Sequence, residues 1–113
     1  MDVQDLILGT EIKLNLNIEP IGGQTLSTYD WQVELYCTPK KSITIRKQDD
    51  GTNDTLKRVV YVDENNYLLL VDTTELGAGT INAKITAYLD DNKFPDGKRT
   101  EIVLVDTGIT INK

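Results

Sequence analysis

The sequence predicts an all-β protein, and three observations lead to this prediction. First, some stretches alternate strictly between apolar and polar residues, most clearly 11–19 and 81–89, which is the period of a strand that buries one face. Second, turn signals built from Gly, Pro, Asp and Asn separate the expected strands at intervals of roughly ten residues. Third, no long segment has the 3.6-residue period of an amphipathic helix.

Residues 1–9 carry an apolar triplet, Leu6, Ile7 and Leu8, which Gly9 closes. The triplet does not alternate, so it is either the start of a first strand with both faces covered or an arm that lies on a neighbouring subunit. Chain ends are ordered only when other parts of a structure hold them. Both interpretations therefore remain open at this point.

Four strands follow in the middle of the chain. After the strand at 11–19, which ends at Pro20 because proline cannot donate to a ladder, we expect strands at 30–38, 42–47, 56–62 and 67–71. In the first of these, Trp31, Val33, Leu35 and Cys37 should point inward, and the lone tryptophan should anchor the core. The strand at 67–71 is almost continuously apolar, which is typical of the middle of a sheet.

The stretch from Val71 to Asp90 predicts a strand, a short helical turn and another strand. Asp72 and Glu75 have the D-x-x-E spacing of a capped turn near residues 73–77, and the glycines after it let the chain leave the turn. In the strand at 81–89 the inward positions alternate between large and small side chains. We expect Trp31 of the opposite sheet to fill the space that Ala83 and Ala87 leave.

The chain then forms a polar loop, 90–99, and a β-branched strand, 100–105, before a bulge or kink at 106–108 and a last strand at 109–112. The predicted fold is therefore an antiparallel immunoglobulin-like β-sandwich of about 7–9 strands, because each half-apolar sheet needs a second sheet to cover it. We expect one domain over residues 1–113, with residues 1–9 as a possible N-terminal arm.

The charge distribution bears on the partners. The net charge of −6 argues against nucleic acid, whose phosphates require clustered Lys and Arg. Between residues 40 and 58, however, six basic residues face three acidic ones. These basic residues either protect edge strands from unwanted pairing or form an electrostatic docking face. The six residues are Lys40, Lys41, Arg46, Lys47, Lys57 and Arg58.

The sequence predicts no enzymatic activity and no catalytic, cofactor or metal site. It contains no histidine, which is the commonest general base and metal ligand, and Cys37 is expected inside the core. The acidic loops at 49–54 and 90–96 lack the spacing of a calcium loop and resemble ordinary turns. Tyr36, Tyr88 and Phe94 could form an aromatic platform for a glycan or contact a protein.

Cellular placement follows from absences in the sequence. The N-terminus lacks a signal peptide, and no apolar run has the roughly 20 residues that span a bilayer. The single cysteine of the chain cannot form an internal disulfide. We therefore expect a protein that folds where it is translated and has no membrane partner.

Four segments resemble small immunoglobulin-like domains of tailed-bacteriophage virions: GTEIKLNLNI, DWQVELY, YLLLVDTTELGAGTINAKITAYLDD and RTEIVLVDTGITI. The D-T-x-x-L-G-x-G step from Asp72 to Gly79 and the closing D-T-G-I from Asp106 are similar to structural proteins of Bacteroides phages and prophages. They are more distantly similar to the N-terminal domain of upper baseplate proteins.

The resemblance implies a non-enzymatic building block of a virion that is assembled in the bacterial cytoplasm. The expected role is that of a capsid auxiliary or decoration protein, a head-fibre anchor, or a tail or baseplate module. Its partners would be capsid, fibre or tail proteins, or further copies of the same chain in an oligomer or lattice. A carbohydrate-binding or adhesion module is the alternative. The candidate contacts are the apolar triplet at residues 6–8, the six basic residues between 40 and 58, and Phe94.

Overall fold

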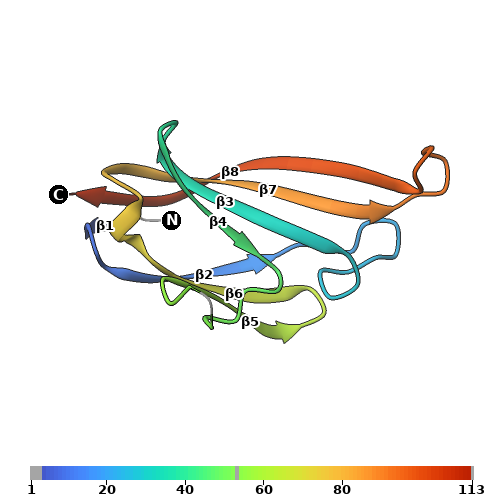
Figure 1. Ribbon diagram of the computed structural model, residues 1–113, viewed down its shortest axis with the longest axis horizontal. Coiled ribbons are helices and arrows are strands. Elements are labelled where there is room, and N and C mark those ends of the chain that lie inside the picture. The colour runs from blue at the N-terminus through green and yellow to red at the C-terminus, as the bar shows by residue number, and fades with distance from the viewer. Residues whose placement is uncertain (1–3, 53, 113) are drawn as a thin grey trace.

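The computed structural model describes residues 4–52 and 54–112, and these residues form two stacked β-sheets (Figure 1). The prediction of an all-β protein is confirmed, since the only helical segment in this part of the chain is one 3₁₀ turn. The elements in chain order are β1 (Gln4–Ile7), β2 (Glu11–Asn17), β3 (Asp30–Thr38), β4 (Lys41–Arg46), β5 (Lys57–Asp63), β6 (Asn66–Asp72), η1 (Thr73–Glu75), β7 (Gly79–Asp90) and β8 (Lys98–Asn112).

The strands divide unequally between the two sheets. Sheet A has five strands in the order β1-β8-β7-β3-β4, and sheet B has three in the order β2-β6-β5. All neighbours pair antiparallel except β1 and β8, which run parallel with Gln4 opposite Ile109 and Ile7 opposite Asn112. The expectation of a purely antiparallel sandwich is therefore wrong. The chain begins beside its own last strand, running in the same direction, and then crosses to sheet B through Gly9 and Thr10.

Several local predictions are confirmed. β3 has the predicted bounds, and β6, the almost continuously apolar segment, is the central strand of sheet B. The predicted turn is η1, where the Asp72 carboxylate accepts a hydrogen bond from the Thr74 backbone N–H at 2.9 Å. The predicted kink at 106–108 coincides with a break in the β7–β8 register opposite Ile81.

The core contains Trp31, as predicted, but its neighbours differ from the expectation. Trp31 is 1% exposed, and its indole N–H donates to the Leu26 carbonyl oxygen at 3.1 Å. It lies directly opposite Ala87 within sheet A, so it does not reach Ala87 from the other sheet. Sheet B instead contributes Tyr67, whose ring meets the indole edge-on with 5.3 Å between the centroids. The small Ala87 leaves lateral room for the indole on the neighbouring strand.

The segment from Gln4 to Leu8 belongs to the domain. β1 pairs with β8, and Leu6 and Leu8 pack partly against the core. Ile7 points away from it and is 62% exposed, so only one face of β1 is covered. The part of the possible arm at residues 1–3 lies outside the described residues.

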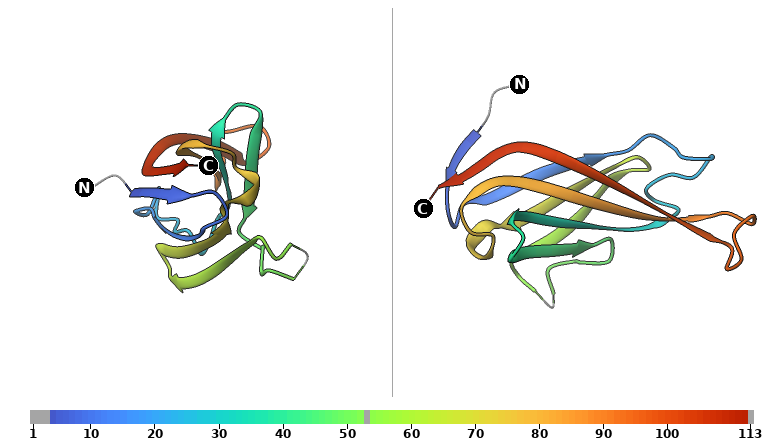
Figure 2. Two further views of the ribbon diagram at one scale, coloured as in Figure 1. Left: turned by 90° about the vertical axis from the view of Figure 1, so that its left-hand side faces the viewer. Right: turned by 90° about the horizontal axis from the view of Figure 1, so that it is seen from above.

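The two long sides of the molecule differ. On one side the chain crosses from β4 in sheet A to β5 in sheet B, and the Lys57 ammonium donates to the Thr44 carbonyl oxygen at 2.6 Å. On the other side the chain crosses from β1 to β2 at one end, and β2 and β8 face each other as strands of different sheets. The molecule measures 47 × 27 × 26 Å, and the β7–β8 hairpin extends along its length to a projecting loop (Figures 1 and 2).

Candidate protein-binding surface

The most exposed apolar run in the described residues lies on β8. Ile102, Val103, Leu104 and Val105 are 56%, 52%, 68% and 41% exposed, although they are consecutive residues of a strand. Because side chains alternate along a strand, Ile102 and Leu104 lie on the outer face of sheet A. Val103 and Val105 lie on the inner face, opposite Ile85 and Ala83 of β7. Both faces of β8 are therefore apolar and open.

The unequal sheets explain why the inner face is open. Sheet B has only three strands, so its edge strand β2 does not cover β8 as β6 covers β3. A groove of ≈ 280 Å³ remains between β2 and β8. Its walls include Leu14, Leu16, Ala83 and Val105, so the groove reaches core residues.

One edge of the exposed run also lacks a strand neighbour. β7 pairs with β8 along almost its whole length, but β1 accompanies only the segment Ile109–Asn112 on the other side. The backbone groups of residues 99–107 on that side therefore meet no strand within the described part of the chain. An unpaired, apolar strand edge is a template for pairing with another chain.

Two of the six basic residues that were predicted to contact a partner form hydrogen bonds within the protein. The Lys47 ammonium donates to the carbonyl oxygens of Ser27 at 2.9 Å and Tyr29 at 2.8 Å, and burial lowers the pKa of Lys47. Lys57 donates to Thr44 and lies 3.8 Å from the Asp49 carboxylate. Both lysines donate hydrogen bonds to backbone carbonyl oxygens of neighbouring segments, so they stabilise the fold.

The other four basic residues are exposed but do not form one patch. Lys40 lies in the turn before β4 and Lys41 begins that strand. Arg46 ends the strand, about 17 Å from Lys41 at the rise of a strand. Arg58 lies on β5 of the other sheet and packs over Gly51. Since β4 and β5 are sheet edges, these positions agree with protection of edges rather than with a single docking face.

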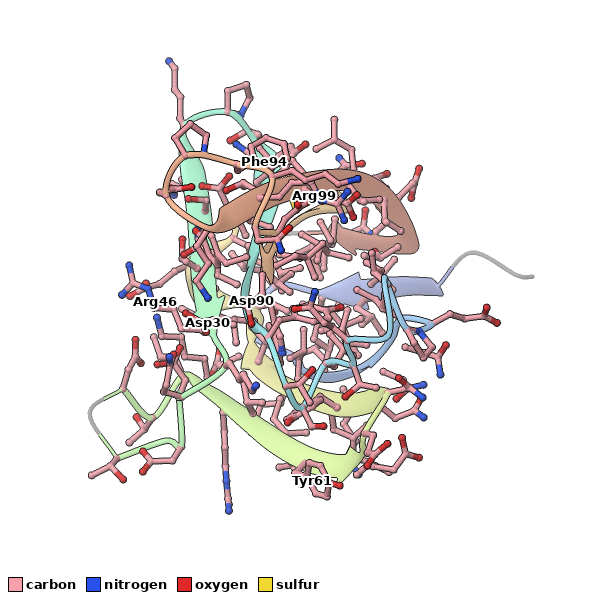
Figure 3. The ribbon with its side chains drawn as sticks, turned by 90° about the vertical axis from the view of Figure 1, so that its right-hand side faces the viewer. Asp30, Arg46, Tyr61, Asp90, Phe94 and Arg99 are labelled. Atoms are coloured by element: carbon pink, nitrogen blue, oxygen red, sulfur yellow. The ribbon has the colours of Figure 1, made fainter. Side chains whose placement is uncertain are left out.

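The remaining predicted contacts are distributed over the molecule. Leu6, Ile7 and Leu8 lie at the β1 end of sheet A. Phe94 is in the loop at the tip of the β7–β8 hairpin, near Arg99 and far from Tyr61 (Figure 3). The structure therefore does not bring these residues together with the basic segment.

The aromatic side chains proposed as a glycan platform are also separated. Tyr36 lies opposite Asn82, and Tyr88 lies six positions further along β7, which corresponds to about 20 Å. Phe94 lies in the loop beyond β7. These three residues do not share one flat surface.

The acidic loops do not form a metal-binding cluster in residues 4–52 and 54–112. No group of three or more His, Cys, Asp or Glu residues there is placed to hold a metal ion, and Asn53 of the first acidic loop lies outside the described residues. Burial raises the pKa of the Cys37 thiol, which donates weakly to the Gly79 carbonyl oxygen at 3.4 Å. The thiol thus behaves as a core group, because the reactive form is the thiolate.

Sequence reasoning missed the exposed run on β8. An unbroken apolar segment such as IVLV normally indicates a strand that is covered on both faces. The position of the segment was the available signal. It follows the hairpin loop and precedes a kink, so it belongs to a long last strand that extends past β1.

Together, the two sheets, the open strand edge and the groove define an all-β protein with a surface suited to strand pairing. No protein-family model matches the sequence. No curated protein and no solved structure is significantly similar to it. Residues 4–52 and 54–112 contain one helical segment, which has three residues. No helix in these residues is long enough to cross a membrane.

Proposed function

We propose that this protein is a non-enzymatic structural subunit of a tailed-bacteriophage virion, either a capsid auxiliary protein or an anchor for head fibres. The observation that carries the proposal is the open edge of β8 with its four exposed apolar side chains. Such an edge can bind a neighbouring protein by adding a strand to the sheet. A structural subunit needs contacts of this kind and no reactive group.

The link to virions rests on the sequence resemblance. The step from Asp72 to Gly79 and the closing strand from Asp106 are the segments that resemble virion domains. In the fold these segments form η1 with the start of β7, and the end of β8. We also propose that the sandwich is immunoglobulin-like, and the two stacked sheets support this proposal.

The test uses virus particles from the bacterium that carries the gene. After induction, tailed particles are purified on a density gradient, and the chain is quantified by mass spectrometry relative to the major capsid protein. The proposal expects a fixed copy ratio that persists through a second gradient. Absence of the chain from intact particles, or a ratio that falls with each purification, would overturn the proposal.

A further inference from the structure

The strands with an open edge differ in how this edge is protected from pairing. β4 carries Lys41 and Arg46 at its ends, and β5 carries Lys57, Arg58 and a bulge between Tyr61 and Asp63. β2 alternates its apolar residues with Lys13, Asn15 and Asn17. Charges, bulges and short length are the features by which edge strands avoid unwanted pairing.

The β8 edge between Thr100 and Val105 has fewer such features. Its one charged residue is Glu101, and it contains no proline, no lysine and no register break with β7 in this segment. The apolar side chains there are exposed on both faces of the sheet. The segment is therefore the most apolar open sheet edge of the described chain.

The charges at the two ends of this segment indicate the partner. Lys98 and Arg99 precede the apolar run, and Asp106 follows it. The Asp106 carboxylate accepts a hydrogen bond from the Gly108 N–H at 2.8 Å but forms no ion pair within the described residues. A strand that is basic at one end and acidic at the other complements a copy of itself that runs in the opposite direction.

We propose that a second copy of this chain pairs antiparallel with the β8 edge about a twofold axis at Ile102. In this register Lys98 of each copy lies opposite Asp106 of the other, Leu104 lies opposite Thr100, and the two Ile102 side chains meet. The five-stranded sheets of the two copies then form one continuous sheet. This inference rests on the proposed structural function and names the partner that the β8 edge binds.

The geometry of the contact sets its expected strength. One pair of strands buries less surface than a standard interface of about 1,600 Å², so the free dimer should have a dissociation constant in the micromolar range. An isologous contact of this kind can still act strongly in a particle, where neighbouring copies are held at high effective concentration.

The first experiment measures the oligomeric state by sedimentation velocity at protein concentrations from about 5 to about 500 µM, a range chosen for a micromolar dimer. The wild-type chain should shift from monomer to dimer. Ile102→Lys should remain monomeric over the whole range, because it places two ammonium groups at the twofold axis. Val62→Lys is the matched control, since Val62 is a similarly exposed apolar residue on β5, and this variant should dimerise like the wild type.

The second experiment tests the register. Asp106→Lys and Lys98→Asp should each weaken the dimer by about tenfold, since each change creates like charges at two symmetric contacts. The double variant with both changes should recover most of the wild-type affinity. Lys98 also pairs with Asp90 in its own chain, so circular dichroism should first establish that the variants keep the fold.

The outcomes separate this inference from the proposed function. A wild-type chain that stays monomeric, an Ile102→Lys chain that still dimerises, or a double charge swap without recovery would overturn the twofold pairing. If the monomeric chain is nevertheless present on virus particles at a fixed ratio, the structural function stands and β8 binds a different virion protein.

Discussion

Thr73 is a buried threonine that links the η1 turn to the crossover between the two sheets. Its hydroxyl donates to the Thr10 carbonyl oxygen at 2.8 Å and accepts from the Gly9 N–H at 3.0 Å. These bonds join residues more than sixty positions apart. They hold the start of the chain against the turn, next to the strand β1 that pairs with β8.

We expect Thr73→Val to lower the free energy of unfolding by about 1–3 kcal/mol, because a valine of the same shape cannot make the two side-chain hydrogen bonds that join η1 to Gly9 and Thr10. Thr100→Val is the matched control. Thr100 is exposed on β8 and its hydroxyl makes no hydrogen bond within the described residues, so its replacement should cost about 0.5 kcal/mol or less. Urea unfolding of both variants measures the difference, and equal costs would contradict the assigned role of Thr73.

The two inward alanines of β7 have different surroundings. Ala87 lies beside the fully buried Trp31, whereas Ala83 borders the groove between β2 and β8. We expect Ala87→Leu to overpack the core and cost about 1–3 kcal/mol. Ala83→Leu should cost less, because the added methyl groups can enter the groove. Denaturation midpoints that fall equally in both variants would argue against this placement.

At the scale of elements, hydrogen bonds to carboxylates define the turns between strands. Asp72 accepts from the Thr74 hydroxyl and from its backbone N–H, and these bonds lower the pKa of Asp72. Asp63 is held in the same way in the turn before β6, where Asn66 and Asn65 donate and lower its pKa. The folded protein therefore favours the ionised form of both carboxylates over the protonated form.

This arrangement predicts an acid dependence. Since folding lowers the pKa of Asp72 from its usual 3.8, its stabilising contribution is present above about pH 4 and is lost as the pH falls through the lower folded value. In Asp72→Asn this pH-dependent contribution is absent. The variant should be less stable than the wild type at pH 7, and the difference should shrink towards about pH 2. Urea unfolding across this range measures the effect, and a constant difference would contradict it.

At the scale of the whole molecule, one side of the sandwich is closed by the β4–β5 crossover, and the other is closed only at one end, by the β1–β2 crossover. The closed side has the β4–β5 crossover, where Lys57 bonds to Thr44 and lies near the carboxylates of Asp49 and Asp54. The open side has the groove and the β8 edge. The β8 edge beyond the β1–β2 crossover thus remains available to a partner.

We expect Lys57→Met to destabilise the protein by about 1–2 kcal/mol, because the charged donor to the Thr44 carbonyl oxygen is lost. The methionine keeps the apolar stem of the side chain. Arg58→Met is the control, since Arg58 is exposed on the opposite face of the same strand. Thermal unfolding compares the two variants, and an unchanged Lys57→Met midpoint would show that the crossover does not depend on this contact.

The sequence by itself determined the strands, the capped turn and the apolar core, because alternation and turn chemistry act over a few neighbouring residues. The bounds of β3, the η1 turn at Asp72 and the kink before Ile109 follow from such local patterns. The candidate contacts were less predictable. From the sequence, Lys47 and Lys57 were interpreted as surface charges, but both donate hydrogen bonds to backbone carbonyl oxygens of other segments.

Only the tertiary structure decided how the strands are distributed between the sheets. That distribution places Trp31 beside Ala87 in one sheet, puts β1 parallel to β8, and leaves three strands to cover five. The exposure of Ile102–Val105 follows from this imbalance. An apolar strand has the same sequence whether or not another strand lies over it, because coverage depends on residues that are distant in the chain.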